Sequence, residues 1–435
     1  MTIKSRHRKP VTTGSLRQHV LLAVSTVVGV VAAWWAMRPS WQVPLPTMAN
    51  RPEVRMQDFR DALYFPIQEF LAGGNPYDPA AMFARWPVRQ GFNLYQPYHL
   101  VLHLPFALPG YRVGAVAFTV LGLLLLVVLA AMAARRLSVR VHVPITLATT
   151  AIAALLMLSQ VGKAQLYLGQ VNPLVVVGAA GALLARHSHP RLATVALAVA
   201  WLKPQFGIPL TILLFARGSR RVALGGTAVA AIASLPVVVL LVLRGGGIGS
   251  FVEAIQANIA NFTHTGYGAV DSLTAQRIDL PAVLFRLTEW LAPAAESIGL
   301  AGVLTIGVVL VRRLDRHADP DAPAIADLLT CLTVVVAVVH QPGDVLIAVP
   351  AATLAAVVWW ARRRERGWWP LGLAVAALAV PFAHLHAVDV AVREALGTRA
   401  SVTLDGVAVV VAWLSLLVLA ARLTAARRAT LAVAP

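Results

Sequence analysis

Charged residues are scarce in this chain of 435 residues. Asp, Glu, Lys and Arg together make up 13% of it, whereas hydrophobic residues make up 58%. Soluble globular domains contain about 25% charged and about 45–50% apolar residues. The apolar excess is too large for one water-soluble core, so the composition excludes an ordinary soluble domain.

Cysteine is almost absent. The single cysteine, Cys331, lies inside an apolar run. One cysteine excludes a disulfide within the chain and a metal site built from cysteine ligands. We interpret Cys331 as a small buried hydrophobic residue.

Acidic residues are about half as numerous as basic ones, 19 against 37, which gives a net charge of +18. Such a charge alone would be compatible with nucleic-acid binding. The basic residues, however, form short clusters between apolar runs, which is how membrane proteins fix their orientation. We therefore expect a membrane protein with no nucleic-acid partner.

Apolar runs of about 20 residues, enough to cross the hydrocarbon core of a bilayer, recur along the chain. We predict an all-α polytopic membrane protein with about 12 membrane segments. Its parts are a basic cytoplasmic tail at residues 1–18 and a single transmembrane domain at residues 19–428.

The segments alternate consistently when the basic clusters are placed in the cytoplasm. Two long polar stretches, residues 38–93 and 244–297, then form extracytoplasmic loops, and most acidic residues fall outside. Residues 192–215 have basic residues on both flanks and Lys203 followed by Pro204 at their middle. This favours a hairpin of two half-helices with Lys203 at its tip. The alternative is one tilted span, which would move Arg217 to the outside.

The first outer loop contains a predicted amphipathic helix suited to the membrane surface. Its apolar positions recur at helical spacing: Phe59, Leu63, Ile67 and Phe70. Asp58 and Asp61 are three residues apart and share one face. A carboxylate held there can act as a general base on a hydroxyl. Alternatively, it is a solvated residue favoured by the helix dipole.

Other polar residues lie at the predicted outer ends of segments: Gln165, Gln170, Asn172, Lys203, Gln205, His340 and Asp344. Ionisable residues at membrane depth usually mark a substrate path. Lys203 at a broken helix suits a phosphate, or extends its ammonium to the membrane surface. His340 suits a proton carrier, a phosphate ligand or a hydrogen-bonded interfacial histidine. Asp344 can orient His340 or cap the following helix.

His384 and His386 lie two residues apart, near Asp389. A metal site needs more ligands at workable spacing. We interpret this segment as an interfacial loop, and we predict no metal and no cofactor.

Several short motifs occur in one order over about 300 residues. They are Asp58 and Tyr64 followed by Leu71-Ala-Gly-Gly-Asn-Pro-Tyr77, Tyr95-Gln-Pro97 with Leu104-Pro-Phe106 and Leu108-Pro109, Leu168-Gly-Gln-Val-Asn-Pro-Leu174, Trp201-Leu-Lys-Pro204, and His340-Gln-Pro-Gly-Asp344. On these motifs the chain resembles the actinobacterial polytopic mannosyltransferases of the GT-C superfamily (glycosyltransferase family 87), which use polyprenyl-phosphate sugars. The Gly-Gln-x-Asn and Leu-Lys-Pro motifs are the more specific. One departure is Tyr95-Gln96-Pro97, where the family pattern has Tyr-Pro-Pro.

The resemblance implies a GT-C-like fold and an inverting transfer at the extracytoplasmic face of the plasma membrane. Asp58 matches the family's first-loop catalytic Asp, which deprotonates a sugar hydroxyl. The implied donor is a polyprenyl-phosphate sugar, with mannose as the sugar, and the acceptor is a cell-envelope glycolipid or polysaccharide. The leaving phosphate needs positive groups, for which Lys203 and His340 are candidates. The residues expected to bind substrate are Asp61, Tyr64, Tyr95, Gln170, Asn172, Lys203, His340 and Asp344.

Two alternatives stay open. One is an arabinofuranosyltransferase with the corresponding lipid-phosphate donor. The other is a membrane transporter. Transporters often have two related halves with broken helices in matching positions, and the predicted hairpin has no evident counterpart in the second half of this sequence.

Overall fold

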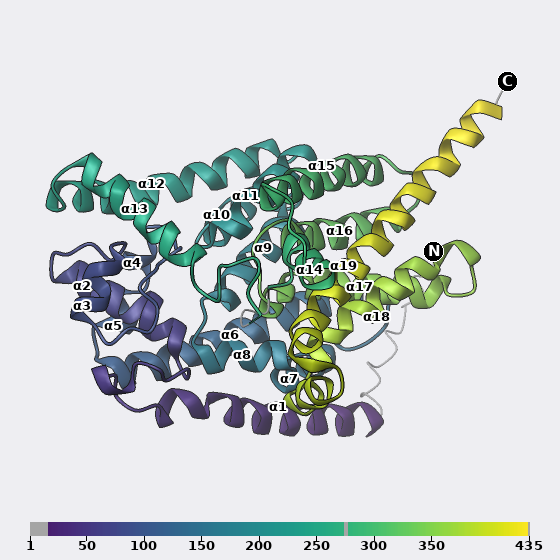
Figure 1. The fold of residues 1–435 in the computed structure, drawn as a ribbon. Helices are drawn as coiled ribbons and strands as arrows, with labels where there is room; N and C mark the ends of the chain where they lie inside the picture. The colour runs from purple at the N-terminus through teal and green to yellow at the C-terminus, as the bar shows by residue number, and fades with distance from the viewer. Residues whose placement is uncertain (1–15, 274–276, 434–435) are drawn as a thin grey trace, which may run out of the picture.

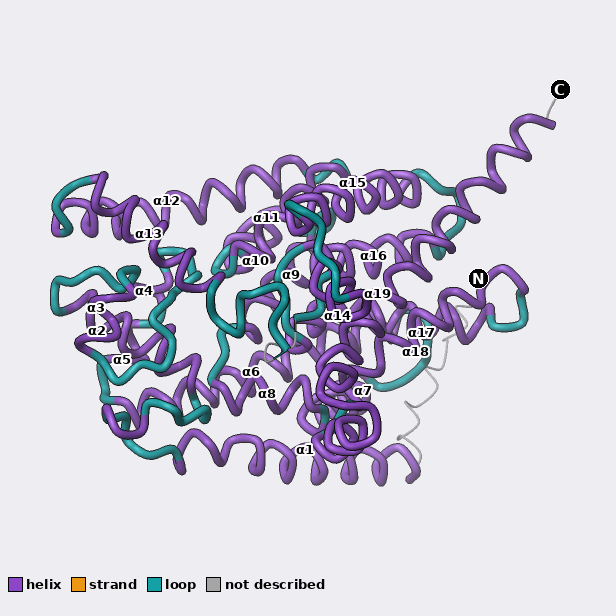
Figure 2. Tube along the Cα trace, in the orientation of Figure 1, coloured by secondary structure: helices purple, strands orange, loops and turns teal. Residues whose placement is uncertain are grey.

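The computed structural model describes residues 16–273 and 277–433. All regular structure in these ranges is helical, as predicted (Figures 1 and 2). Most of the predicted basic tail, residues 1–15, lies outside the described residues, and residues 16–18 belong to the first helix.

The helices follow one another along the chain without strands between them in the described ranges. They are α1 (Leu16–Gln42), α2 (Phe65–Leu71), α3 (Pro79–Arg85), α4 (His99–Leu102), α5 (Leu104–Ala107), α6 (Tyr111–Ser138), α7 (Ile145–Leu158), α8 (Gln160–Leu168), α9 (Asn172–Ala185), α10 (Pro190–Ala200), α11 (Pro204–Ala216), α12 (Arg220–Arg244), α13 (Ile248–Thr263), α14 (Leu280–Thr288), α15 (Ala295–Asp315), α16 (Ala322–Ala337), α17 (Val349–Arg362), α18 (Trp369–Ala383) and α19 (His386–Val433). Within α19 the axis breaks at Gly397, whose φ is 84°. Shorter helical turns are η1 (Met48–Asn50), η2 (Phe59–Tyr64), η3 (Pro342–Ala348) and η4 (Arg366–Trp368).

Six described helices are long and apolar enough to cross a membrane: α1, α6, α12, α15, η3 with α17, and α19. The pair α7 and α8 reaches the same length but is bent by 69°. Four further apolar helices, α9, α10, α11 and α16, are shorter. Every run predicted as a membrane segment is therefore helical, and the chain is a helical membrane protein. The total of 12 segments remains a prediction.

Residues 192–215 form two helices, as the hairpin prediction requires. α10 ends at Ala200, and α11 begins at Pro204 after an extended Lys203 with φ −110° and ψ 107°. Arg186, just before α10, and Arg217, just after α11, both contact Asp327, at 3.2 Å and 3.0 Å. Both flanks of the segment thus lie at the same end of the bundle, which contradicts a single straight span.

One end of the bundle holds a cluster of ion pairs between helices distant in sequence. Its basic members are Arg136, Arg140, Arg186, Arg217 and Arg362, and its acidic members are Asp315, Asp319, Asp321 and Asp327. Arg217 is fully buried there, and it contacts Asp315 at 2.7 Å. A buried guanidinium is tolerated only when carboxylates compensate its charge. Ion pairs therefore connect the loops that were predicted to lie in the cytoplasm.

The other end of the bundle holds α2 to α5 and α13 (left in Figure 1). Asn93 and Asn258 exchange two hydrogen bonds there, from Asn93 N–H to Asn258 Oδ1 (2.7 Å) and from Asn258 Nδ2 to Asn93 O (2.8 Å). These bonds join the two predicted outer loops. The ends are well separated, because α6 has 28 residues and therefore spans about 42 Å.

The helix predicted around Phe59 forms as η2 and α2, and its apolar residues are buried within the protein. Phe59, Leu63 and Ile67 are at most 1% exposed. The ring of Phe59 lies 5.7 Å from that of Tyr111 on α6. Its apolar face is therefore part of the protein core, because α6 and its neighbours cover it.

Candidate active site

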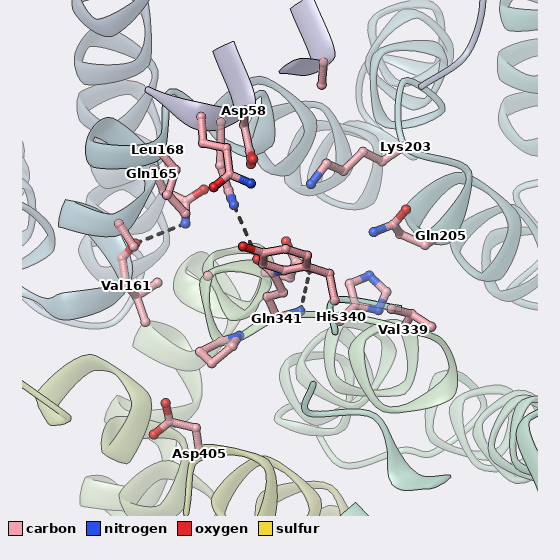
Figure 3. Close-up of a pocket in the computed structure, with 18 of the residues that line it drawn as sticks. Asp58, Val161, Gln165, Leu168, Lys203, Gln205, Val339, His340, Gln341 and Asp405 are labelled. Carbon is pink, nitrogen blue, oxygen red and sulfur yellow. Dashed lines mark hydrogen bonds between the residues drawn. The ribbon is translucent and has the colours of Figure 1, made fainter. Parts of the chain in front are cut away.

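A cavity of about 370 Å³ lies where the two predicted outer loops meet the bundle. Its walls come from stretches far apart in sequence, including residues 54–62, 160–170, 203–205, 339–344 and 381–389. Six of the predicted site residues line it: Asp58, Tyr95, Gln170, Lys203, His340 and Asp344. Figure 3 shows Asp58 and Lys203 pointing from opposite walls toward a common space.

Asp58 is held in place by its chain neighbours. The N–H of Met56 donates to the carbonyl of Tyr167 at the end of α8, at 2.8 Å. Gly169, with φ +67°, allows the close approach of Met56 and Phe59, because a Cβ there would lie 2.8 Å and 2.7 Å from their side chains. The π-helical turn η2 begins directly after Asp58, and such turns are frequent at functional sites.

The charge of Asp58 is set by two opposing influences. The pKa of its carboxyl is raised to about 6: burial is the largest cause, the Lys203 ammonium opposes the rise, and the charge of Asp61 adds to it. Desolvation disfavours the carboxylate, whereas an opposite charge favours it. The result is a carboxylate that is ionised at neutral pH and has raised basicity, as a general base requires.

The motif Gly169-Gln-Val-Asn172 connects Asp58 to Asp344. Gln170 lies beside Asp58 in the cavity wall and helps to lower the pKa of its carboxyl, and its Nε2 donates to Gln341 Oε1 at 3.4 Å. The two Nδ2 protons of Asn172 go to Gln170 Oε1, at 2.7 Å, and to Asp344 Oδ1. Asn172 itself does not line the cavity, so it is a positioning residue. The motif therefore couples the first outer loop to the turn that precedes α17.

Lys203 lies at the broken point between α10 and α11. The N–H of Gln96 donates to the Leu202 carbonyl at 3.1 Å, and the Tyr98 hydroxyl donates to the Ala198 carbonyl at 2.5 Å. These bonds tie the turn to the segment after the first outer loop. The Lys203 ammonium lies 5.7 Å from the ring centroid of Tyr95, within range of a cation–π contact. It is 8% exposed, so the cavity provides its main access.

His340 is buried against Phe206, with ring centroids 4.6 Å apart. Its Nδ1 lies 2.9 Å from the Val338 carbonyl, and its Nε2 has no hydrogen-bond partner among the described residues. Burial lowers the pKa of His340, and the Asp344 carboxylate opposes this. Nδ1 must carry a proton to donate to a carbonyl, so Nε2 of the neutral ring is an acceptor.

Asp344 caps the turn η3. Its Oδ2 accepts the Gln341 N–H at 2.9 Å, and its Oδ1 accepts from Asn172. Asp344 is thus the capping-box partner of Gln341, the N-cap of η3, and it caps this turn and not α17 itself, whose N-cap is Ala348. No direct hydrogen bond joins Asp344 and His340 among those of the described residues.

Asp61 and Tyr64 lie outside the cavity, contrary to the prediction that they bind substrate. Asp61 pairs with Arg60 at 2.6 Å and accepts the N–H groups of Arg89 and Gln90, both at 3.1 Å. Tyr64 packs its ring against those of Phe65 and Tyr111. The helix turns these side chains into the protein, because residue spacing alone does not fix which face meets a cavity.

Sequence reasoning missed several residues that line the cavity: Gln57, Gln90, Gln160, Phe262, Tyr267, Gln341 and Asp405. The sequence offered little indication of their role, because most of them are isolated amide or aromatic residues outside any recognisable motif. The interpretation of residues 384–389 as an interfacial loop is wrong, because His384 and Asp389 line the cavity and His384 is 6% exposed. No group of three His, Cys, Asp or Glu side chains in the described ranges is arranged to hold a metal.

The fold and the cavity define a class: a polytopic helical membrane protein with a partly open cavity that contains a carboxylate and an ammonium. A family model described as Glycosyltransferase family 87 matches residues 93–342, more than half of the chain. The chain therefore belongs to glycosyltransferase family 87. No curated protein and no solved structure matches it.

The matched region contains Gln170, Lys203 and His340 but begins after Asp58 and ends before Asp344. The assignment of Asp58 to the site therefore depends on the geometry of the cavity.

Proposed function

We propose that this glycosyltransferase moves mannose from a polyprenyl-phosphate donor to a hydroxyl of a cell-envelope glycolipid or polysaccharide, with inversion. We further propose that the reaction takes place at the extracytoplasmic face of the plasma membrane. The observation that carries the proposal is the pairing of Asp58, a half-buried carboxylate whose pKa is raised to about 6, with Lys203 in one cavity.

In this scheme Asp58 is the general base. The acceptor hydroxyl oxygen attacks the anomeric carbon of the donor, and its proton passes to the Asp58 carboxylate. The bond from the anomeric carbon to the phosphate oxygen breaks, and polyprenyl phosphate leaves with the bonding electrons. One displacement inverts the configuration at the anomeric carbon, and no covalent sugar–enzyme intermediate is needed.

Lys203 is the proposed partner of the leaving phosphate. A fixed ammonium in a water-poor cavity stabilises charge that develops on a leaving group. His340 contributes a second contact as the imidazolium, because a bound phosphate supplies the counter-charge that favours the protonated ring. Its Nε2–H then donates to a phosphate oxygen.

The proposed partners and sidedness follow from the same arrangement. A lipid donor reaches a cavity inside a membrane protein from the bilayer, so no nucleotide-binding loop is required. The cavity lies at the end of the bundle opposite the arginine-rich ion pairs, and basic clusters face the cytoplasm in most membrane proteins.

Family membership favours an enzyme over the transporter considered from the sequence. The arabinofuranosyltransferase alternative uses the same residues with another donor sugar, so the donor must be tested directly.

The test uses the purified full-length protein in lipid nanodiscs, with radiolabelled polyprenyl-phosphate mannose and cell-envelope glycolipids as acceptors. The wild type should transfer mannose, and Asp58→Asn should lower kcat by about 10²–10⁴-fold. The matched control is Asp319→Asn, which removes a carboxylate from the ion pairs at the other end. Undiminished transfer by Asp58→Asn would exclude this residue as the base. Transfer from polyprenyl-phosphate arabinose alone would replace mannose as the donor sugar.

A further inference from the structure

A second group of polar side chains lines the cavity, and the transfer scheme does not use it. His384 follows α18, and its Nδ1 lies 2.8 Å from Oδ1 of Asp405 on α19. Its Nε2 lies 3.8 Å from Oδ1 of Asp389. All three residues line the cavity, and Figure 3 shows Asp405 well apart from Asp58 and Lys203.

His384 is buried but not satisfied. Asp405 occupies its Nδ1, while its Nε2 has no hydrogen-bond partner among the described residues. Buried polar atoms are normally paired, and an unpaired one in a cavity wall indicates a missing partner.

The position of the proton on the His384 ring decides which ring nitrogen donates a hydrogen bond and which accepts one. Nδ1 next to a carboxylate carries the proton, so Nε2 of the neutral ring accepts. Asp389 is also an acceptor, and Ser401 and Arg393 already donate to it and fix its orientation. This wall of the cavity therefore presents acceptors.

The acceptor groups on this wall of the cavity determine which kind of ligand it can bind. A phosphate carries acceptor oxygens and negative charge, so two carboxylates repel it. Sugar hydroxyls donate, are uncharged and come in vicinal pairs, so neighbouring hydroxyls can donate to Nε2 of His384 and to Asp389. The cavity is thus divided between a cationic wall at Lys203 and an acceptor wall at His384.

We infer that His384, oriented by Asp405 and accompanied by Asp389, binds the hydroxyl groups of a sugar in this cavity. The inference rests on the proposed function for the presence of a sugar, and it assigns a place for it. The hydroxyls belong either to the acceptor or to the donor sugar, and the chemistry of recognition is the same.

The inference is tested by binding, without turnover. Full-length protein in nanodiscs is titrated with methyl α-D-mannopyranoside, polyprenyl phosphate and polyprenyl-phosphate mannose. His384→Ala should weaken binding of a mannose-bearing probe by about tenfold, the loss of one buried hydrogen bond. Binding of sugar-free polyprenyl phosphate should stay within about twofold. His384→Gln, which retains an acceptor oxygen, should recover part of the loss.

The control is His317→Ala, a histidine at the arginine-rich end that bonds the Leu423 carbonyl. It should leave all three affinities unchanged. Loss confined to the mannoside assigns the subsite to the acceptor, and loss confined to polyprenyl-phosphate mannose assigns it to the donor sugar. Equal loss for sugar-free polyprenyl phosphate, or no loss for either mannose probe, overturns the inference. So does a wild type that binds neither mannose probe.

Kinetics separate the inference from the proposed function. If the wild type transfers no mannose, the proposed function fails, while the binding titrations still decide the role of His384. If transfer occurs, His384→Ala should raise KM more than it lowers kcat. A fall in kcat at unchanged KM would make His384 a participant in the chemical step and contradict a binding role.

Discussion

At the scale of single residues, the Lys203 ammonium influences the ionisation of Asp58 in the cavity. Burial and Lys203 act in opposite directions on the pKa of Asp58. Sequence reasoning identified both residues because they are unusual for their surroundings, an acid near a membrane and a lysine inside an apolar stretch. Residue spacing alone did not separate Asp58 from Asp61, and the family resemblance assigned the catalytic role to Asp58. Only the packing shows that Asp58 lines the cavity and Asp61 does not.

The pH dependence of transfer should report Asp58. In the wild type, kcat/KM should rise with pH through about 6, the pKa of Asp58, because the base acts as the carboxylate and kcat/KM follows the free enzyme. In Lys203→Met the midpoint should move to higher pH, since the charge that lowers this pKa is gone. Lys163→Met, outside the cavity, is the control. An unchanged midpoint in Lys203→Met would contradict the coupling of the two groups.

The raised pKa of Asp58 predicts that ionisation of this residue destabilises the folded protein at neutral pH. In the folded protein the pKa of Asp58, about 6, lies above 3.8, the ordinary value of an aspartate. The folded protein therefore binds this proton more tightly than the unfolded chain. The resulting stabilisation is present below the unfolded pKa and is lost as pH rises through about 6. Asp58→Asn, neutral at all pH, should raise Tm at pH 7.5 by avoiding a cost on the order of 2 kcal/mol.

Thermal unfolding in the same nanodiscs measures this effect at several pH values. The Tm difference between Asp58→Asn and the wild type should shrink as the pH falls below about 6. It should vanish only below about 3.8, where the carboxyl is protonated in the folded and the unfolded state alike. A variant less stable than the wild type at pH 7.5 would mean that the carboxylate stabilises the fold, contrary to the direction of its pKa shift.

At the scale of elements, the helices followed from composition, but their breaks carry the site. The bend between α7 and α8, the π-helical turn η2 and the interruption at Lys203 each bring backbone or side chains to the cavity. The interruption at Lys203 was predictable, because Pro204 cannot continue a helix from the preceding residue without cost. The π-helical turn was not, since residues 59–64 fit an ordinary helix equally well.

A substitution at Gly169 tests the contact between the end of α8 and the first outer loop. Gly169→Ala should lower transfer by about tenfold or more, because its Cβ would displace the segment that carries Asp58 and misplace the base. The matched control is Gly73→Ala, whose φ of +88° is also left-handed but whose Cβ would meet no atom within 4 Å. Both variants lose about 1–2 kcal/mol of stability to the backbone conformation.

The transfer rates and Tm values of the two variants distinguish backbone strain at a positive φ from displacement of the segment that carries Asp58. A similar loss of transfer in both variants would mean that the close approach at Gly169 does not position Asp58.

At the scale of the whole molecule, two sets of loops meet at two separate ends. The loops predicted for the cytoplasm share one network of ion pairs around Asp327, and those predicted for the outside meet through Asn93 and Asn258. The basic clusters predicted these groupings, because charge is costly to move across a bilayer. They did not predict that His384 and Asp405 would join the cavity.

Sidedness is the prediction at this scale. In a Cys331→Ser background, a membrane-impermeant maleimide on intact cells should label Ala72→Cys, in the turn after α2. It should not label Arg364→Cys, between α17 and α18. Both positions are exposed in the structure, so permeabilised cells should show labelling of both. Labelling of Arg364→Cys on intact cells, or protection of Ala72→Cys, would place the cavity on the other side of the membrane.

The sequence by itself determined the membrane class, the positions of the apolar helices, the break at Lys203 and the choice of Asp58, Lys203 and His340 as chemical groups. These follow from local chemistry, since apolar length, proline and isolated charge act within a few residues. Only the tertiary structure decided that Asp61 and Tyr64 turn into the core, that Asn172 bridges Gln170 and Asp344, and that His384 faces the cavity beside Asp405. Each of these depends on which helices pack together, because a side chain's partner across 20 to 200 residues is set by the shape of the whole bundle.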